Sequence, residues 1–173
     1  MVVLATQTLS YLHPTISLDK NWYLATWIVS NTRQDAPDNA NFFPGLGYRT
    51  DDWWTEALMW KQWSKKRDTW GIDGRFGLSN PKLLLYVELG ITLATRDLFL
   101  FVSSEYPMGK KWKVGVETEN FRRAQGLFLG AGPRLSYVWG KFASGPVVTT
   151  LAYQMRRNES DIIQLYLVIH PRL

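Results

Sequence analysis

The chain has 173 residues, 25 of them Trp, Tyr or Phe, no cysteine, and a formal net charge of +5. This length suits one domain, so we expect residues 1–173 to form a single unit. The missing cysteines exclude a disulfide framework and a thiolate metal site, the small scattered charge argues against nucleic acid as a partner, and no stretch approaches the ~20 apolar residues of a membrane helix.

Eleven segments show the two-residue alternation of β-strands and are separated by turn signals. In chain order the predicted strands are Leu4–Leu18, Trp22–Ser30, Phe43–Arg49, Trp53–Ser64, Thr69–Leu78, Leu83–Leu93, Leu98–Glu105, Trp112–Phe121, Leu127–Trp139, Val147–Arg156 and Ile162–His170. No helical period persists along the chain. The sequence therefore predicts an all-β protein.

The first predicted strand contains His13-Pro14, where proline cannot donate a hydrogen bond to a sheet ladder. A break at this point would change the strand number. Since single-chain barrels of the outer membrane usually have an even number of strands, we expect ten or twelve, with ten favoured.

The connections between the segments alternate in character. One set is compact, such as Ser79-Asn80-Pro81, and the other is more charged, such as Lys65–Asp68. Successive hairpins of an antiparallel up-and-down meander fall on opposite ends, which gives this alternation. We expect Asn31–Asn41 to be the longest mobile loop.

The two faces of the predicted strands differ in composition. Between Leu83 and Ala94, one face carries Leu, Val and Ile, and the other carries Glu88, Gly90 and Thr92. Glycine does not solubilise an exposed face, but in a crowded interior it leaves room for larger side chains. We therefore expect the polar face to line the interior of a barrel and the apolar face to contact lipid. The alternative is a soluble, lipocalin-like barrel that binds an apolar ligand with its apolar face inside.

Four acidic and four basic side chains belong to the polar face. They are Asp73, Arg75, Glu88, Lys113, Glu117, Glu119, Arg134 and Arg156. Because unpaired charges are costly in a narrow interior, we expect these side chains to form ion pairs. A balanced interior argues against strong ion selectivity.

Seven Trp residues lie at the ends of predicted strands, where indole rings form the aromatic belts of membrane proteins. They are Trp22, Trp53, Trp54, Trp63, Trp70, Trp112 and Trp139. Basic residues of the charged connections are candidates for contact with lipopolysaccharide phosphates. These are Lys65, Lys66, Arg67, Arg122 and Arg123. A plain solvated rim is the alternative for them.

Catalytic chemistry finds little support in the sequence. The only histidines are His13 and His170, and neither has the spacing of a Ser-His-acid system or of a metal site. We therefore expect neither catalytic activity nor a cofactor, and a membrane-embedded lipid-modifying enzyme stays open as a further alternative.

Three hairpins, Ser10–Trp27, Phe99–Val116 and Gly130–Tyr153, each combine two alternating strands, a tight turn and nearby aromatic residues. In this the chain resembles bacterial outer-membrane β-barrel proteins, although it ends on Leu173 rather than on the aromatic residue common among them. The resemblance implies an antiparallel transmembrane barrel of about 10–12 strands in a bacterial outer membrane, with an export signal already removed. It also implies the bilayer, lipopolysaccharide or an envelope protein as partners. We expect either a structural or interaction role or a narrow channel.

Overall fold

The computed structural model describes residues 5–33, 36–64, 68–142, 145–157 and 160–169, and it places most of them in twelve strands. The strands are β1 (Ala5–Leu12), β2 (Thr15–Ser17), β3 (Trp22–Arg33), β4 (Ala36–Arg49), β5 (Trp53–Ser64), β6 (Thr69–Ser79), β7 (Leu84–Thr92), β8 (Leu98–Met108), β9 (Trp112–Arg123), β10 (Gly126–Phe142), β11 (Gly145–Arg157) and β12 (Ile162–Ile169). Within these ranges no helix is long and apolar enough to cross a membrane.

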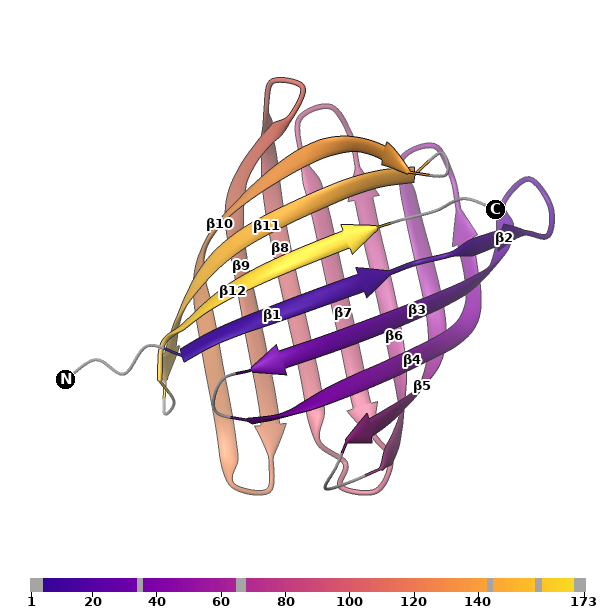
Figure 1. The fold of residues 1–173 in the computed structure, drawn as a ribbon. Helices are drawn as coiled ribbons and strands as arrows, with labels where there is room; N and C mark the ends of the chain where they lie inside the picture. Colours follow the sequence, from indigo (N-terminus) through magenta and orange to yellow (C-terminus); the bar gives the residue numbers. More distant parts are fainter. Residues whose placement is uncertain (1–4, 34–35, 65–67, 143–144, 158–159, 170–173) are drawn as a thin grey trace.

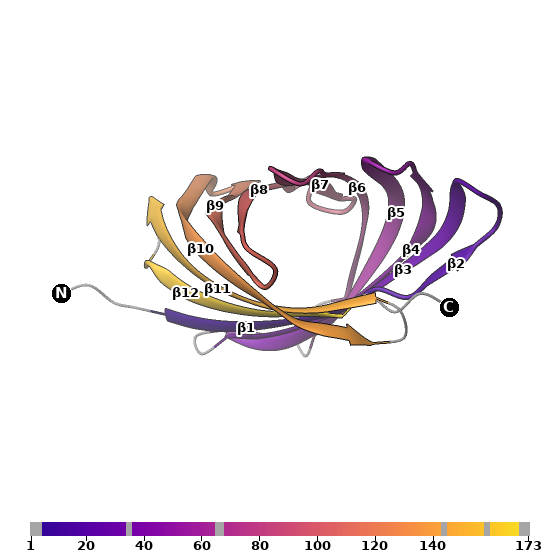
Figure 2. The ribbon, with the colours of Figure 1, turned by 90° about the horizontal axis from the view of Figure 1, so that it is seen from above.

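The strands form one closed sheet (Figures 1 and 2). From β2 to β12, each strand pairs with the next along the chain in antiparallel orientation, and β12 returns to pair with β1. Strands β1 and β2 pair with successive stretches of β3, so together they form one strand position in the wall of the barrel. The barrel formed by the described strands therefore has eleven places, and the predicted all-β barrel is confirmed.

The closing pair is parallel, with Ala5 opposite Ile162 and Leu12 opposite Ile169. Figure 1 shows β1 in indigo beside β12 in yellow, with both arrows pointing the same way. An odd number of alternating strands makes the first and the last run in the same direction. The expected even number and the purely antiparallel sheet are therefore wrong for the described strands, whereas eleven lies within the predicted range of about 10–12.

The predicted break at His13-Pro14 separates β1 from β2. The N–H of His13 still donates to the carbonyl of Ile169 at 2.9 Å, and the carbonyl of Pro14 accepts from the N–H of Thr26 at 3.2 Å. The chain thus changes partner at the proline, from β12 and β3 to β3 alone, without leaving the wall of the barrel.

The predicted loop Asn31–Asn41 is mostly strand instead. Asn31 pairs with Asn39 and Val29 with Asn41, and strand β4 begins at Ala36. Polar composition is typical of a loop, but here the Asn side chains face a polar interior. The polar composition of this segment therefore reflects its place on the inner face of the barrel and not a solvent-exposed loop.

Connections alternate between the two ends of the barrel, as predicted. We call the end at which β2–β3, β4–β5, β6–β7, β8–β9 and β10–β11 connect the turn end. The other end, at which β3–β4, β5–β6, β7–β8, β9–β10 and β11–β12 connect, is the loop end.

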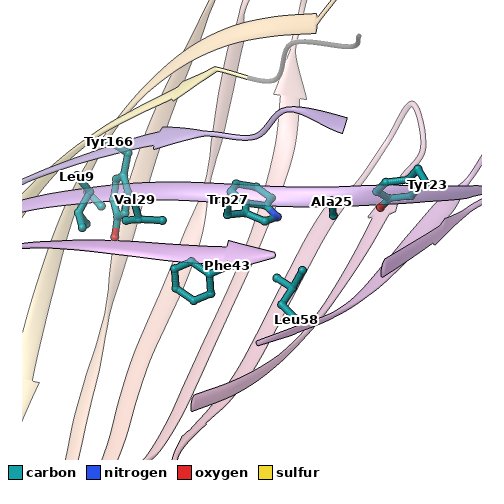
Figure 3. Close-up of a cluster of buried hydrophobic side chains, with 9 residues drawn as sticks. Leu9, Tyr23, Ala25, Trp27, Val29, Phe43, Leu58 and Tyr166 are labelled. Atoms are coloured by element: carbon teal, nitrogen blue, oxygen red, sulfur yellow. The ribbon is translucent and has the colours of Figure 1, made fainter. Parts of the chain in front are cut away.

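Part of the interior is apolar. Figure 3 shows Leu9, Val29 and Tyr166 gathered together, with Trp27, Ala25 and Tyr23 following along β3. Phe43 of β4, Leu58 of β5 and Ala152 of β11 complete this cluster.

Candidate functional site

The main candidate site is the interior of the barrel, where the described residues line a cavity of about 540 Å³. Its lining includes Lys113 and Arg123, the second and last residues of β9, so the cavity follows this strand nearly from end to end. Spread over the ~40 Å of a twelve-residue strand, this volume gives a mean cross-section on the order of 15 Å². Such a width suits water, ions and small solutes.

The cavity has two different walls. Strands β3 to β8 supply aromatic rings, among them Trp27, Phe43, Trp54, Trp60, Tyr86 and Phe101. Strands β8 to β12 and β1 supply mainly polar and charged groups, among them Gln7, Glu105, Lys113, Glu119, Arg134 and Thr150. Strands β6 and β7 add Asp73, Arg75 and Glu88 to the aromatic side, so a molecule in the cavity would meet hydrogen-bonding groups on both sides and most of the ring faces on one.

Glycine makes room for the inward aromatic rings. Tyr23 is opposite Gly47, Trp60 is opposite Gly71, and Trp54 is opposite Gly77. A Cβ atom at any of these glycines would overlap the facing ring. The glycines of the polar face thus let large rings lie flat against the neighbouring strand, as expected for a crowded interior.

Arg75 links two of the expected interior acids. Its Nε donates to Asp73 Oδ1 at 2.6 Å and its Nη2 donates to Glu88 Oε1 at 3.3 Å. The guanidinium also lies over the rings of Trp27, at 4.5 Å, and Phe43, at 4.6 Å. The side chain of Arg75 is 1% exposed, so this charge is compensated by two carboxylates and two ring faces.

Arg134 links a second pair of acids on the opposite wall. Its Nε donates to Glu105 Oε1 at 3.2 Å and its Nη1 to Glu117 Oε2 at 3.1 Å. The other oxygen of Glu117 accepts from Gln154 at 2.6 Å and from the Tyr166 hydroxyl at 2.9 Å. Glu117 has no exposed surface, and three donors hold its carboxylate in place.

The remaining expected bases are Arg156 and Lys113. Arg156 forms an ion pair with Glu119, beside a chain of amides in which Gln164 donates to Gln7 at 2.9 Å. Lys113 lines the cavity near the turn end. Ion pairs thus join seven of the eight expected interior charges to one another or to further acids.

Two acids on the inner faces of the described strands are absent from the sequence-based set, Glu105 and Glu56, and Asp97, just before β8, also lines the cavity. Glu56 is 3% exposed and its carboxylate lies 2.9 Å from His13 Nε2. It accepts from the Tyr23 hydroxyl at 2.9 Å and from Trp27 Nε1 at 2.6 Å. The imidazole of His13 stacks on Trp27, with ring centroids 3.9 Å apart. Strand parity could have identified Glu56, since it shares a face with Leu58, but both faces of β5 carry large apolar residues.

The described interior network therefore holds six carboxylates and four Lys or Arg side chains rather than equal numbers. Two further bases, Arg49 and Arg123, are the last residues of β4 and β9 and lie at the turn end and the loop end. Arg123 lines the cavity, and the Arg49 guanidinium lies 5.1 Å from the centroid of the Tyr23 ring.

The outer face of the described strands is largely apolar, with basic residues toward the loop end. Side chains from around the barrel are each at least 38% exposed, including Leu24, Ile28, Leu46, Met59, Ile72, Leu89, Leu100, Leu129, Leu135, Leu151, Met155 and Leu165. The charged side chains described above point the other way. This is the arrangement that the alternation predicts.

Aromatic rings form two chains of contacts around the outside of the turn end. In the first chain, the ring centroids of successive residues are 5.1, 5.5 and 6.3 Å apart, in the order Trp22, Tyr48, Trp53 and Phe76. Trp112, Tyr137 and Trp139 follow with 4.7 and 4.9 Å. Trp63 and Trp70 are exposed near the loop end. Trp54 is not part of this outer belt, because it packs inward against Gly77 and lines the cavity.

The candidate lipopolysaccharide contacts are not all alike. Arg122 pairs with Leu98 and Leu127 on the outer face, whereas Arg123 lies over Phe121 and Phe128 and lines the cavity. The candidates Lys65, Lys66 and Arg67 lie outside the described residues.

One acid in a loop-end connection is also well held. The Asp161 carboxylate accepts from the Tyr153 hydroxyl at 2.7 Å and from the Arg156 N–H at 3.0 Å, and these two hydrogen bonds lower its pKa. At the turn end, backbone N–H groups of Trp22 and Asn21 lower the pKa of Asp19 in the same way.

Among the described residues, no group of three His, Asp or Glu side chains could hold a metal ion. Comparison with known proteins finds no matching family model, no matching curated protein and no matching solved structure.

Proposed function

We propose that this chain is an integral β-barrel of a bacterial outer membrane, with a narrow, charge-paired passage through its interior. The observation that carries the proposal is the outer face, where large apolar side chains stay exposed around the whole barrel. Soluble monomers rarely expose apolar patches above a few hundred Å². Hydrocarbon would cover this face without cost.

The size of the strands supports the same reading. A membrane-spanning β-strand needs about 9–11 residues, and β3, β5, β6, β8 and β9 have 11 or 12. The outer aromatic chains at the turn end fit one membrane–water interface, because indole and phenol rings have an apolar body and a polar tip.

The interior supports a passage of low conductance. The cavity follows β9 over almost its full length, but Arg75 and Arg134 each extend into it between two carboxylates. Water and small ions would pass these groups more easily than larger solutes. A soluble barrel for an apolar ligand is less well supported. Its binding cavity would have to be lined by the apolar face of the strands, and that face points outward.

Reconstitution into planar bilayers tests this proposal. We expect the protein to insert, to change its gel mobility on heating, and to carry a small current. Lys113→Trp should reduce that current because it narrows the turn-end mouth, whereas Lys110→Trp, in the adjoining turn, should not. Insertion without current would favour a plugged barrel with a structural or interaction role. The proposal would be contradicted if the protein stays monomeric in buffer without detergent and does not insert into bilayers.

A further inference from the structure

Among the strand side chains that the structure describes, the charged groups on the outer face are all basic. Lys61, Arg122 and Arg157 face outward, since they pair with the outward Trp70, Leu127 and Leu129. All three lie toward the loop end, and the described carboxylates of the strands face inward. This end of the outer wall therefore suits negatively charged surroundings.

Lys61 is the most deeply placed of these bases. It is the fourth residue from the end of β5, whereas Arg122 and Arg157 are within two residues of a strand end. On its own strand its outward neighbours are Met59 and Trp63, 54% and 43% exposed. Across the sheet it pairs with Phe42 on one side and with Trp70 on the other.

Two indole rings flank the ammonium group. Lys61 Nζ lies 5.0 Å from the centroid of Trp63 and 5.3 Å from that of Trp70. Cation–π contact stabilises the charge but leaves the N–H groups of the ammonium without acceptors. Within the described part of the chain, neither Lys61 nor the indole N–H groups of Trp63 and Trp70 have a protein acceptor. The cluster therefore offers hydrogen-bond donors and a positive charge, and no carboxylate of the described residues is bonded to them.

We propose that Lys61, Trp63 and Trp70 form a binding site for the phosphate group of an anionic membrane lipid. This inference rests on the proposed insertion into a bilayer. A lipid phosphate brings negative oxygens to the depth at which interfacial indoles lie, while its acyl chains cover the apolar surface around Met59 and Phe42. Charge complementarity and apolar surface thus favour a phospholipid over a free anion.

Native mass spectrometry of the detergent-solubilised protein tests this site, with phosphatidylglycerol as the probe. We expect one tightly retained lipid on the wild type, and about tenfold weaker retention on Lys61→Met, because a charge-assisted contact is lost. Lys61→Arg should retain the lipid. Lys20→Met is the matched control, since it removes an exposed positive charge from the turn end, and it should behave as the wild type.

The other outcomes are distinguishable. Equal retention by Lys61→Met and the wild type would overturn the site, provided that both show the same heat-modifiable mobility. Displacement of the lipid by inorganic phosphate at constant ionic strength would also overturn it, because the site would then recognise a free anion. Failure of the wild type to enter vesicles of any composition would instead contradict the proposed function on which the inference rests.

Discussion

The glycines of β6 provide a sharp test of the crowded interior, because they point to both sides of one strand. Gly71 and Gly77 face inward against Trp60 and Trp54, whereas Gly74 faces outward. None of the three has a positive φ angle, so alanine is compatible with the backbone at each. The loss of glycine is common to all three substitutions, so the difference between them reports on the space available to the Cβ atom.

The expected magnitudes differ at the three positions. A Cβ at Gly77 would lie 2.6 Å from Cζ2 of Trp54 and closer still to Nε1 and Cε2, so the indole must move by more than 0.8 Å to reach ordinary contact at 3.4 Å. Overpacking of this kind costs about 1–3 kcal/mol. At Gly71 the new atom would also overlap the backbone carbonyl of Ile91, so we expect about 3 kcal/mol.

Gly74→Ala is the matched control. Its nearest neighbour would be the carbonyl oxygen of Leu89 at 3.9 Å, so there is no clash, and removal of a strand glycine should stabilise by about 0.5 kcal/mol. The assay is reversible urea unfolding in vesicles, followed by tryptophan fluorescence. A second measurement is a double-mutant cycle. In the Trp54→Ala background, Gly77→Ala should lower the free energy of unfolding by less than it does in the wild type, because the ring is gone. If Gly74→Ala and Gly77→Ala destabilise equally, ring contact is not the cause.

Two other predictions concern charged groups. Glu117→Gln should lower the free energy of unfolding by about 3 kcal/mol, because the amide places a donor opposite Arg134 in a fully buried site; an unchanged urea midpoint would contradict this. Asp19 has a pKa below its ordinary 3.8, so its stabilising effect is present above that pH and is lost as the pH falls through the folded-state pKa. Asp19→Ala should therefore lower the melting temperature at pH 6 and lower it less and less as the pH falls below 3.8, and a loss that does not depend on pH would refute the role of its charge.

Sequence reasoning predicts the barrel well because alternation is a direct consequence of strand geometry. It also locates the break at His13-Pro14, since proline lacks the required donor. It does not give the odd strand number, because that depends on whether β1 and β2 share one place in the sheet, and only their common partner β3 decides this.

The interior site is harder to predict, for a physical reason. Strand β5 has large apolar residues on both faces, with Leu58 buried and Met59 exposed, so composition does not tell which face Glu56 shares. The same ambiguity places Trp54 in the outer belt when it actually lies inside. Parity identifies a face only where one face is clearly polar, as in β7 with Glu88.

Lipid exposure of the outer face is the central claim, and site-directed spin labelling tests it most directly. Because the chain has no cysteine, single-cysteine variants at Leu46, Leu89, Leu135 and Leu151 can each be labelled cleanly. In reconstituted vesicles, all four labels should collide more with molecular oxygen than with a water-soluble nickel chelate, since oxygen partitions into hydrocarbon. Preferential collision with the nickel chelate at these positions would mean that the apolar face meets water, and would contradict a membrane-spanning barrel.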